Sequence, residues 1–283
     1  MSALFGPAGN SESFSERYKL FSDIPKYISE MKLDIYEYQF GRGVRMSSDN
    51  AKKLKEEAKK YSMEFTAHAP YYISLSSEDE TKRLGSIRYI LESAKAVTEL
   101  GGKRIIVHSG SVGKRTRGEA LTLAKDTLAL SMEALDEANY SDVIVCPETM
   151  GKIGQLGSLE EVMELCSVDE RIIPCIDFGH LNARTAGGIK GKEDYEAILE
   201  TIENSIGLNR LRKIHIHFSK IEYTAGGEKR HLTFEDTVFG PNPEELLKLI
   251  ALRKLEPYII CESDGTQAED AFTMKELYNK YLQ

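Results

Sequence analysis

The sequence has few cysteines and no C-x-x-C pair. Only four cysteines occur among 283 residues, and Cys146, Cys175 and Cys261 lie within short apolar segments typical of buried strands. A chain of this length can build a hydrophobic core without a disulfide framework. We therefore expect buried, reduced thiols in a cytoplasmic protein.

No segment of the sequence is long and apolar enough to cross a membrane. The longest apolar stretches, RIIPCID and PYIICES, fall far short of the roughly 20 residues that a spanning helix needs. The first residues, MSALFGPAGNSESF, do not combine a basic region with an apolar run, so they do not resemble a signal peptide. These absences predict a protein without a membrane partner.

Acidic residues outnumber basic ones in the sequence. The chain has 37 Lys and Arg residues against 45 Asp and Glu residues, which gives a formal net charge of −8. This balance argues against a protein that coats nucleic acid by bulk electrostatic attraction. It still permits a local basic rim on an acidic body.

Short β-rich segments alternate with helical segments along the whole chain. Apolar residues at three- and four-residue spacing predict the helices, and Ser158 with Glu161 and Ser77 with Glu80 resemble capping boxes. No G-x-G-x-x-G follows the first strand and no linker divides the chain, so the pattern predicts a single α/β domain over residues 1–283, a (β/α)8 or TIM barrel. The expected strands are 3–6, 34–40, 64–70, 104–110, 142–148, 171–177, 211–219 and 258–263.

All six histidines and three acidic residues lie at the ends of predicted strands or just after them. In a (β/α)8 barrel these ends meet at one face, so the side chains would crowd one mouth. Packed carboxylates repel one another, and metal cations remove that penalty. Any one of these residues alone is typical of a core histidine or a helix cap, but their clustering favours a metal site. They are His68, His108, Glu148, Asp177, His180, His215, His217, His231 and Glu262.

The ligand types narrow the choice of metal. Imidazole and carboxylate groups without a thiolate suit Zn²⁺, Mn²⁺ or Fe²⁺. Because side chains alternate along a strand, His215 and His217 point to the same face, and either or both can reach the site. Two divalent cations with three carboxylates leave a charge of about +1, which suits an anionic transition state such as that of an attacked phosphodiester.

Seven segments resemble the endonuclease IV family, whose members cut DNA at abasic sites. They occur in the family's order and span nearly the whole chain, which indicates a divergent branch of that family. The resemblance implies a TIM barrel with zinc ions, and a hydrolase that cleaves the phosphodiester 5′ to abasic sites in damaged double-stranded DNA for base-excision repair. We expect a monomer. The segments are HAPYYISL (68–75), VHSGS (107–111), PETMGKIGQLGS (147–158), CIDFGHLNA (175–183), HIHFSK (215–220), EKRH (228–231) and CES (261–263).

The resemblance distributes the ligands over two zinc ions that share one carboxylate, and it makes Glu148 and Glu262 the catalytic carboxylates. It places a third ion near His180 and His231. The ligands it implies for the first two ions are His68, His108 and Glu148 for one, and Glu148, Asp177, His215 and Glu262 for the other.

The third ion is where the chain departs from the family. The family usually has an aspartate two residues before the last histidine, and Lys229 stands there instead. The segment from His215 to His231 is one residue longer than the family's, so a shift of one residue would bring the carboxylate of Glu228 into the vacant place. The alternative is a site without an ion, in which both histidines only form hydrogen bonds.

Five residues are candidates for contact with DNA. Tyr71 matches a tyrosine that lies near the DNA in the family, and the GRGVR loop with Arg42 and Arg45 falls where the family has a loop that enters the DNA. Lys229 and Arg230 would extend a basic rim. The alternative is that each of these cations is an ordinary solvent-exposed side chain with no role in DNA binding.

Two other functions stay open. A xylose-isomerase-like sugar isomerase or epimerase would use one metal ion, but it would leave four of the histidines without a role. A binding protein that has kept the metals and lost catalysis is the other possibility. The number of metal ions and the charge of the rim distinguish the three. The one-metal ligands would be Glu148, Asp177, His215 and Glu262.

Overall fold

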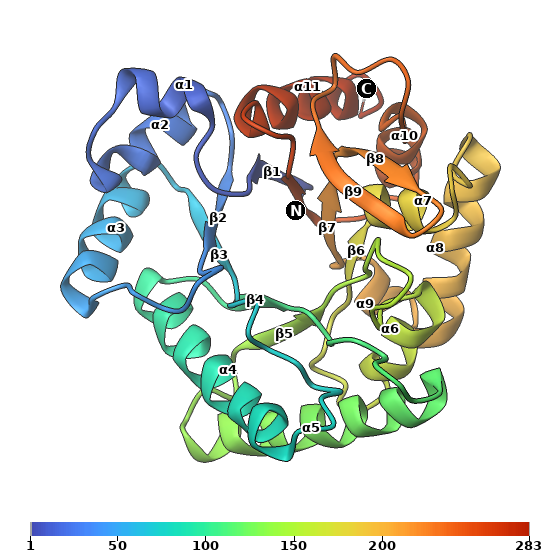
Figure 1. Cartoon of the computed structure of the whole chain (residues 1–283). Helices are drawn as coiled ribbons and strands as arrows, with labels where there is room; N and C mark the ends of the chain where they lie inside the picture. The colour runs from blue at the N-terminus through green and yellow to red at the C-terminus, as the bar shows by residue number, and fades with distance from the viewer. Residues whose placement is uncertain (1, 283) are drawn as a thin grey trace.

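Eight parallel strands form a closed ring in the computed structural model, which describes residues 2–282 (Figure 1). Hydrogen bonds arrange them in two four-stranded sheets, β1-β10-β7-β6 and β2-β3-β4-β5. Isolated parallel bridges, Ala8 to Glu37 and Glu148 to Cys175, join the sheets at both seams. The predicted (β/α)8 barrel is confirmed. In ring order the strands are β1 (Leu4–Pro7), β2 (Ile35–Gln39), β3 (Glu64–His68), β4 (Arg104–Val107), β5 (Ile144–Pro147), β6 (Cys175–Asp177), β7 (His215–Phe218) and β10 (Tyr258–Cys261).

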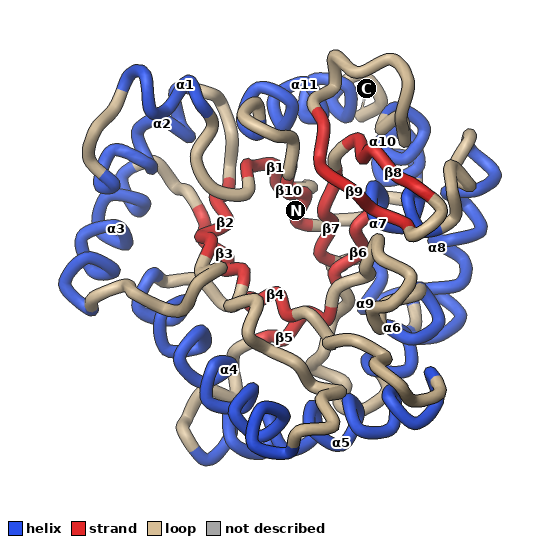
Figure 2. Tube along the Cα trace, viewed as in Figure 1, coloured by secondary structure: helices blue, strands red, loops and turns tan. Residues whose placement is uncertain are grey.

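Helices form a layer outside this ring (Figure 2). Ser158 and Glu161 form the predicted capping box of α6. The predicted box at Ser77 is wrong, because α4 begins after Asp79, whose side chain accepts from the backbone N–H of Lys82. None of the helices described between residues 2 and 282 is both long and apolar enough to cross a membrane. They are α1 (Glu12–Arg17), the 3-10 helix η1 (Phe21–Asp23), α2 (Ile24–Glu30), α3 (Ser48–Lys60), α4 (Glu80–Leu100), α5 (Arg117–Glu137), α6 (Leu159–Cys166), α7 (Phe178–Arg184), α8 (Lys192–Ile206), α9 (Leu208–Leu211), α10 (Glu244–Leu252) and α11 (Gln267–Asn279).

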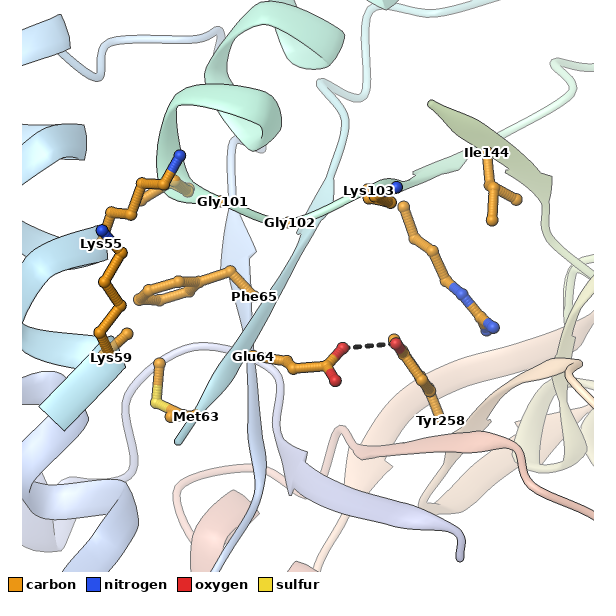
Figure 3. A pocket seen from close by; sticks show the side chains of 13 residues that line it. Lys55, Lys59, Met63, Glu64, Phe65, Gly101, Gly102, Lys103, Ile144 and Tyr258 are labelled. Atoms are coloured by element: carbon orange, nitrogen blue, oxygen red, sulfur yellow. Dashed lines mark hydrogen bonds between the residues drawn. The ribbon is translucent and has the colours of Figure 1, made fainter. Parts of the chain in front are cut away.

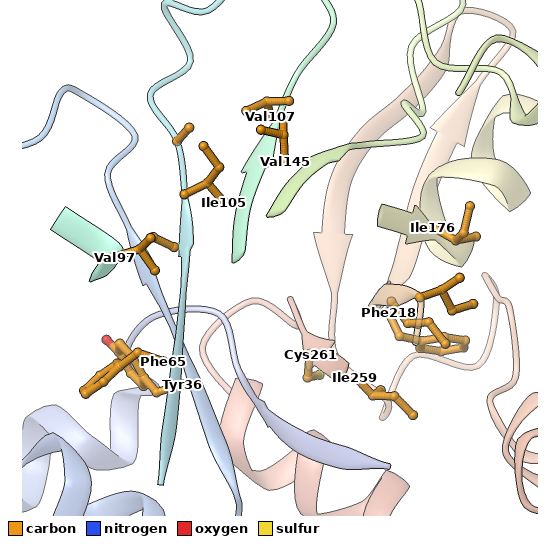
Figure 4. Packing of buried hydrophobic residues seen from close by; sticks show 14 of the residues in the cluster. Tyr36, Phe65, Val97, Ile105, Val107, Val145, Ile176, Phe218, Ile259 and Cys261 are labelled. Atoms are coloured by element: carbon orange, nitrogen blue, oxygen red, sulfur yellow. The ribbon is translucent and has the colours of Figure 1, made fainter. Parts of the chain in front are cut away.

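The main hydrophobic core lies between the strands and the helices. Strand side chains that point outward, among them Phe65, Ile105 and Phe218, pack with helix residues such as Val97 (Figure 4). Full burial of one such side chain contributes about 1.5–3 kcal/mol, so this layer carries most of the stability. All four cysteines are buried and free, as expected.

Alternate residues of the same strands point into the barrel. They form small apolar clusters separate from the main core, one of which contains Ile106, Cys146 and Cys175. Because a strand rises about 3.3 Å per residue, inward residues two apart lie about 6.6 Å apart along the strand and belong to successive layers. This layering decides which inward side chain reaches the mouth.

An antiparallel hairpin, β8 (Lys220–Thr224) and β9 (Gly227–Leu232), follows β7 and was not predicted. It lies beside α7 at the carboxyl ends of the strands (Figure 1). A bridge between Lys152 and Gly227 ties it to the loop after β5. The hairpin therefore fixes Glu228 and His231 at the barrel mouth.

Candidate metal centre

Ligand-type side chains from several strand ends line one pocket of about 470 Å³ at the barrel mouth. Their nitrogen and oxygen atoms fall into three groups at this mouth, each with all its atoms within 4.8 Å of one another. The three groups contain every predicted metal ligand except His215, and they add His217. They are His68, His108 and Glu148; Glu148, Asp177, His217 and Glu262; and His180, Glu228 and His231.

The first group has the spacing of ligands on one ion. Oε2 of Glu148 lies 3.3 Å from Nε2 of His68 and 3.0 Å from Nε2 of His108. Ligands bound tetrahedrally to zinc at about 2.1 Å lie about 3.4 Å apart. Nδ1 of His68 is 2.9 Å from the carbonyl oxygen of Ala69. A carbonyl can only accept, so Nδ1 carries the proton and Nε2 offers its lone pair to a metal.

The second group shares Glu148 with the first. Nδ1 of His217 lies 3.2 Å from Oε1 of Glu148 and 3.5 Å from Oε1 of Glu262. Oδ2 of Asp177 is buried and accepts no hydrogen bond from residues 2–282, and its nearest cation-forming group is Nδ1 of His180 at 3.2 Å. A buried carboxylate oxygen that accepts no hydrogen bond is costly unless a cation lies beside it, so this oxygen fits a metal ligand.

The structure corrects the assignment of His215 to this second group. His215 stands two residues before His217 on β7, so it lies one layer deeper in the barrel. Its Nε2 is 3.1 Å from Oε2 of Glu37, and its side chain is fully buried. The two histidines do share a face, as expected, but only the later one reaches the mouth.

The third group contains Glu228 and not Lys229. Oε2 of Glu228 lies 3.3 Å from Nε2 of His180, which is buried and has no hydrogen-bond partner within the described chain. Nδ1 of His180 is 2.9 Å from the carbonyl oxygen of Thr149 and must donate to it, which leaves Nε2 free for a metal. Lys229 instead forms an ion pair with Glu222.

His180 owes its position to Asp177. Asp177 ends β6 and caps α7, and its Oδ1 accepts a hydrogen bond of 2.6 Å from the backbone N–H of His180. One carboxylate oxygen thus holds the helix that carries His180, while the other oxygen faces the second group. Asp177 thus belongs to the second group and His180, three residues later, to the third, so this short segment joins the two groups.

Glu37 is a buried acid that the sequence reasoning missed. It lies in the middle of β2 with no exposed surface. Oε1 lies 3.0 Å from Nε2 of His217, and Oε2 accepts a hydrogen bond of 3.0 Å from the hydroxyl of Thr66. A carboxylate behind a ligating histidine orients its ring and fixes which nitrogen faces the metal. The available signal was an acid on the inward face of an otherwise apolar strand, DIYEYQF.

Charges in the mouth are strongly coupled. Burial would raise the pKa of Glu148, but hydrogen bonds from His108, His180 and other histidines hold it well below its usual range. Burial would lower the pKa of His180, but the charges of Asp177 and Glu148 raise it to about 10. Burial raises the pKa of Glu262. The protein thus concentrates negative charge here and balances it with imidazolium where no metal is bound.

One of the predicted DNA contacts lies directly at the mouth. Tyr71 is 60% exposed, and its ring centre lies 5.5 Å from that of His108. Gly41 supports this ring, because a β-carbon there would be 2.8 Å from it. Arg42 and Arg45, in the loop after β2, are exposed, and no hydrogen bond or ion pair joins them to another described residue.

The other two predicted cations are already paired. Nζ of Lys229 lies 2.5 Å from Oε1 of Glu222, and Nε of Arg230 lies 2.6 Å from Oε2 of the same carboxylate. Because Lys229 and Arg230 share the carboxylate of Glu222, the three side chains together carry a net charge of only +1. Lys152, which was not predicted, lines the pocket on the loop after β5.

Residues 25–278 match the model of the xylose isomerase-like TIM barrel family. The chain belongs to this family. An uncharacterized protein of Methanocaldococcus jannaschii is 35% identical over 98% of this chain and 97% of its own. A probable endonuclease 4 of Mycoplasma pneumoniae is 30% identical over 73% of this chain and 70% of its own. These relatives confirm the resemblance to endonuclease IV and the divergence from it.

Several solved structures are similar to this chain across nearly its whole length. A D-tagatose 3-epimerase-like protein has a TM-score of 0.74 and 24% identity, covering 99% of this chain and 97% of its own. Endonuclease IV from Thermus thermophilus has a TM-score of 0.69 and 15% identity, covering 99% of this chain and 98% of its own. At these identities the likeness shows the fold alone, and it does not choose between the two activities.

Proposed function

We propose that this protein is a metal-dependent endonuclease that hydrolyses the phosphodiester 5′ to abasic sites in double-stranded DNA. The observation that carries this proposal is the presence of three ligand groups at one mouth, two of which share Glu148. An isomerase or epimerase with one metal needs only the second group. It would leave the first and third groups, five further ligand-type side chains, without a function.

The donor atoms fit zinc ions, with manganese or iron as further candidates. All three groups offer only imidazole nitrogens and carboxylate oxygens. Two of these atoms, Oδ2 of Asp177 and Nε2 of His180, are buried without a hydrogen-bond partner among the described residues. When bound, such ions activate water and stabilise the charge that develops on an attacked phosphate.

Among the acids of the second group, Glu262 is the most accessible. Its side chain is 14% exposed, against 1% for Glu148 and none for Asp177. Glu262 can therefore contact both a metal ion of the second group and a water molecule in the pocket. We assign to Glu262 the role of orienting that water. Glu148, which lies between two groups, holds them at a fixed separation.

Tyr71 and the loop of Arg42 and Arg45 form the side of the mouth where DNA would bind. An exposed aromatic ring beside the first group offers a surface on which a sugar or base can stack. A nucleotide without its base is easily rotated out of the helix, so it can enter the pocket. Because the protein carries a net charge of −8, binding would depend on a few local phosphate contacts and weaken steeply with salt.

The test is incubation of purified protein with a DNA duplex that contains one abasic site. We expect a nick on its 5′ side that leaves a 3′-hydroxyl. Glu262→Gln should abolish the nick, whereas Glu160→Gln, the same change at an exposed acid of α6, should not. Absence of cleavage with zinc, manganese and ferrous iron would contradict the proposal.

A further inference from the structure

A second pocket lies at the other end of the barrel from the candidate metal centre, where the strands begin (Figure 3). Its volume is about 490 Å³, and residues at the starts of β3, β4, β5 and β10 contribute to it. Four of its lining residues are cations, and Glu64 is the one acid among them. The lining thus carries a formal charge of +3 in a protein whose net charge is −8. The cations are Lys55, Lys59, Lys103 and Arg104.

Arg104 carries a buried charge without a counter-charge. It is the first residue of β4 and is only 5% exposed. Its guanidinium carbon lies 3.8 Å from the ring centre of Tyr258, but its side chain forms no hydrogen bond or ion pair with any described residue. Nη1 is sealed from solvent and has no partner. A buried cation in this state is costly, and an anion from solution would offset that cost.

The neighbouring acid does not compensate Arg104. The carboxylate of Glu64 accepts a hydrogen bond from the hydroxyl of Tyr258, drawn as the dashed line in Figure 3. No ion pair joins Glu64 to Arg104 within residues 2–282, although both line the same pocket. Glu256 lines an adjoining pocket together with Arg104, but its carboxylate pairs with Arg212 at 3.2 Å. The lining of the first pocket therefore keeps its formal positive charge.

The three lysines can turn towards a ligand at little cost. Lys59 pairs with Glu56 at 2.8 Å and Lys103 with Asp142 at 3.8 Å, but all four side chains are more than half exposed. Exposed pairs of this kind contribute little free energy and exchange readily. Lys55 has no ion-pair partner in the described chain, and in Figure 3 it lies with Lys59 on one side of the pocket.

We propose that this pocket binds a small phosphate-bearing anion, with Arg104 as the anchor and the lysines around it. A guanidinium presents several N–H groups in a planar fork that matches phosphate oxygens. Met63 and Phe65 line the same pocket and provide apolar contact for an organic part of the ligand. Because this pocket is at the opposite end of the barrel from the mouth, its ligand is not the substrate. The proposal does not rest on the proposed function.

The test is calorimetric titration of purified protein with inorganic phosphate and, in a second arm, with a phosphomonoester such as ribose 5-phosphate. Tighter binding of the monoester would identify an organic phosphate as the ligand class, and equal binding would identify free phosphate. Arg104→Met should weaken binding about tenfold or more. Lys55→Met should weaken it less, and Lys82→Met, at an exposed lysine of α4, should leave it unchanged.

The metal centre also attracts phosphate, so a variant of the mouth separates the two sites. His231→Ala should retain binding that Arg104→Met loses. Binding that survives Arg104→Met and disappears in His231→Ala would overturn the proposal, and so would no binding at all. A thermal scan gives a second readout: without phosphate, Arg104→Met should unfold at the same or a higher temperature than the natural protein. Marked destabilisation with no effect of phosphate would mean that Arg104 serves only to pack on Tyr258.

Discussion

Gly151 lies so close to Glu228 that a β-carbon on the glycine would be 2.6 Å from the β-carbon of the glutamate. The same added atom would be 3.0 Å from the ring of His180. The backbone N–H of Glu228 donates to the carbonyl of Gly151 at 3.2 Å. The loop after β5 and the hairpin thus meet at a point where only glycine fits, and this contact places Glu228 beside His180.

Gly151→Ala should therefore displace Glu228 and lower the affinity for the third metal ion about tenfold or more, as loss of a ligand's support commonly does. The first and second groups should keep their ions. Elemental analysis of purified protein measures this. Gly154→Ala is the matched control, because a β-carbon there meets nothing within 4 Å. An unchanged metal content in Gly151→Ala would contradict the role of Glu228.

The two histidines of β7 should respond differently to the same substitution. His217→Asn should remove one ion, because His217 supplies the only imidazole nitrogen of the second group. His215→Asn should keep the ion count and lower stability, because His215 lies in the deeper layer beside Glu37. Metal content and thermal unfolding of both variants provide the comparison. Loss of an ion from His215→Asn alone would restore the assignment that the sequence implied.

Glu37→Gln should lower the affinity for the ion held by His217 about 10- to 100-fold while the fold persists, since it removes the charge behind the imidazole. Glu37→Leu should also destabilise the protein by about 3–5 kcal/mol, because it leaves buried imidazoles without their partner. Competition with a chromogenic chelator gives the affinity, and denaturant unfolding gives the stability. Equal metal affinity in the natural protein and Glu37→Gln would mean that Glu37 only supports the core.

The sequence predicted the ligands that depend on strand order, and it also offered Glu228 and His231, but it missed the depth of the β7 histidines, Glu37 and the hairpin that carries the third group. Strand ends meet in any such barrel, so His68, His108, Glu148 and Glu262 were predictable. His215 and His217 have the same parity, and only the axial position of β7 in the ring separates them. Glu37 was missed because it lies mid-strand, and the hairpin because β8 and β9 pair outside the barrel.

Removal of metal should lower the stability of the whole protein. Four carboxylates, those of Glu148, Asp177, Glu228 and Glu262, meet at the mouth, and their repulsion is balanced only by imidazolium when no cation is bound. Each ion present at about 100 times its dissociation constant stabilises the folded state by about 2.7 kcal/mol. Thermal unfolding before and after dialysis against EDTA measures this, and added zinc should restore the lost stability. An unfolding temperature that does not respond to EDTA or zinc would contradict a metal centre.

The most direct test of the central claim is a parallel assay of one preparation on two substrates. The protein, with its metal content measured, is incubated with duplex DNA that carries one abasic site and, separately, with a ketohexose. We predict at least two ions per chain, a nick 5′ to the abasic site that Glu262→Gln abolishes, and no change in the sugar. Epimerisation of the ketohexose with one ion per chain and intact DNA would contradict this account and show that the protein is a sugar epimerase.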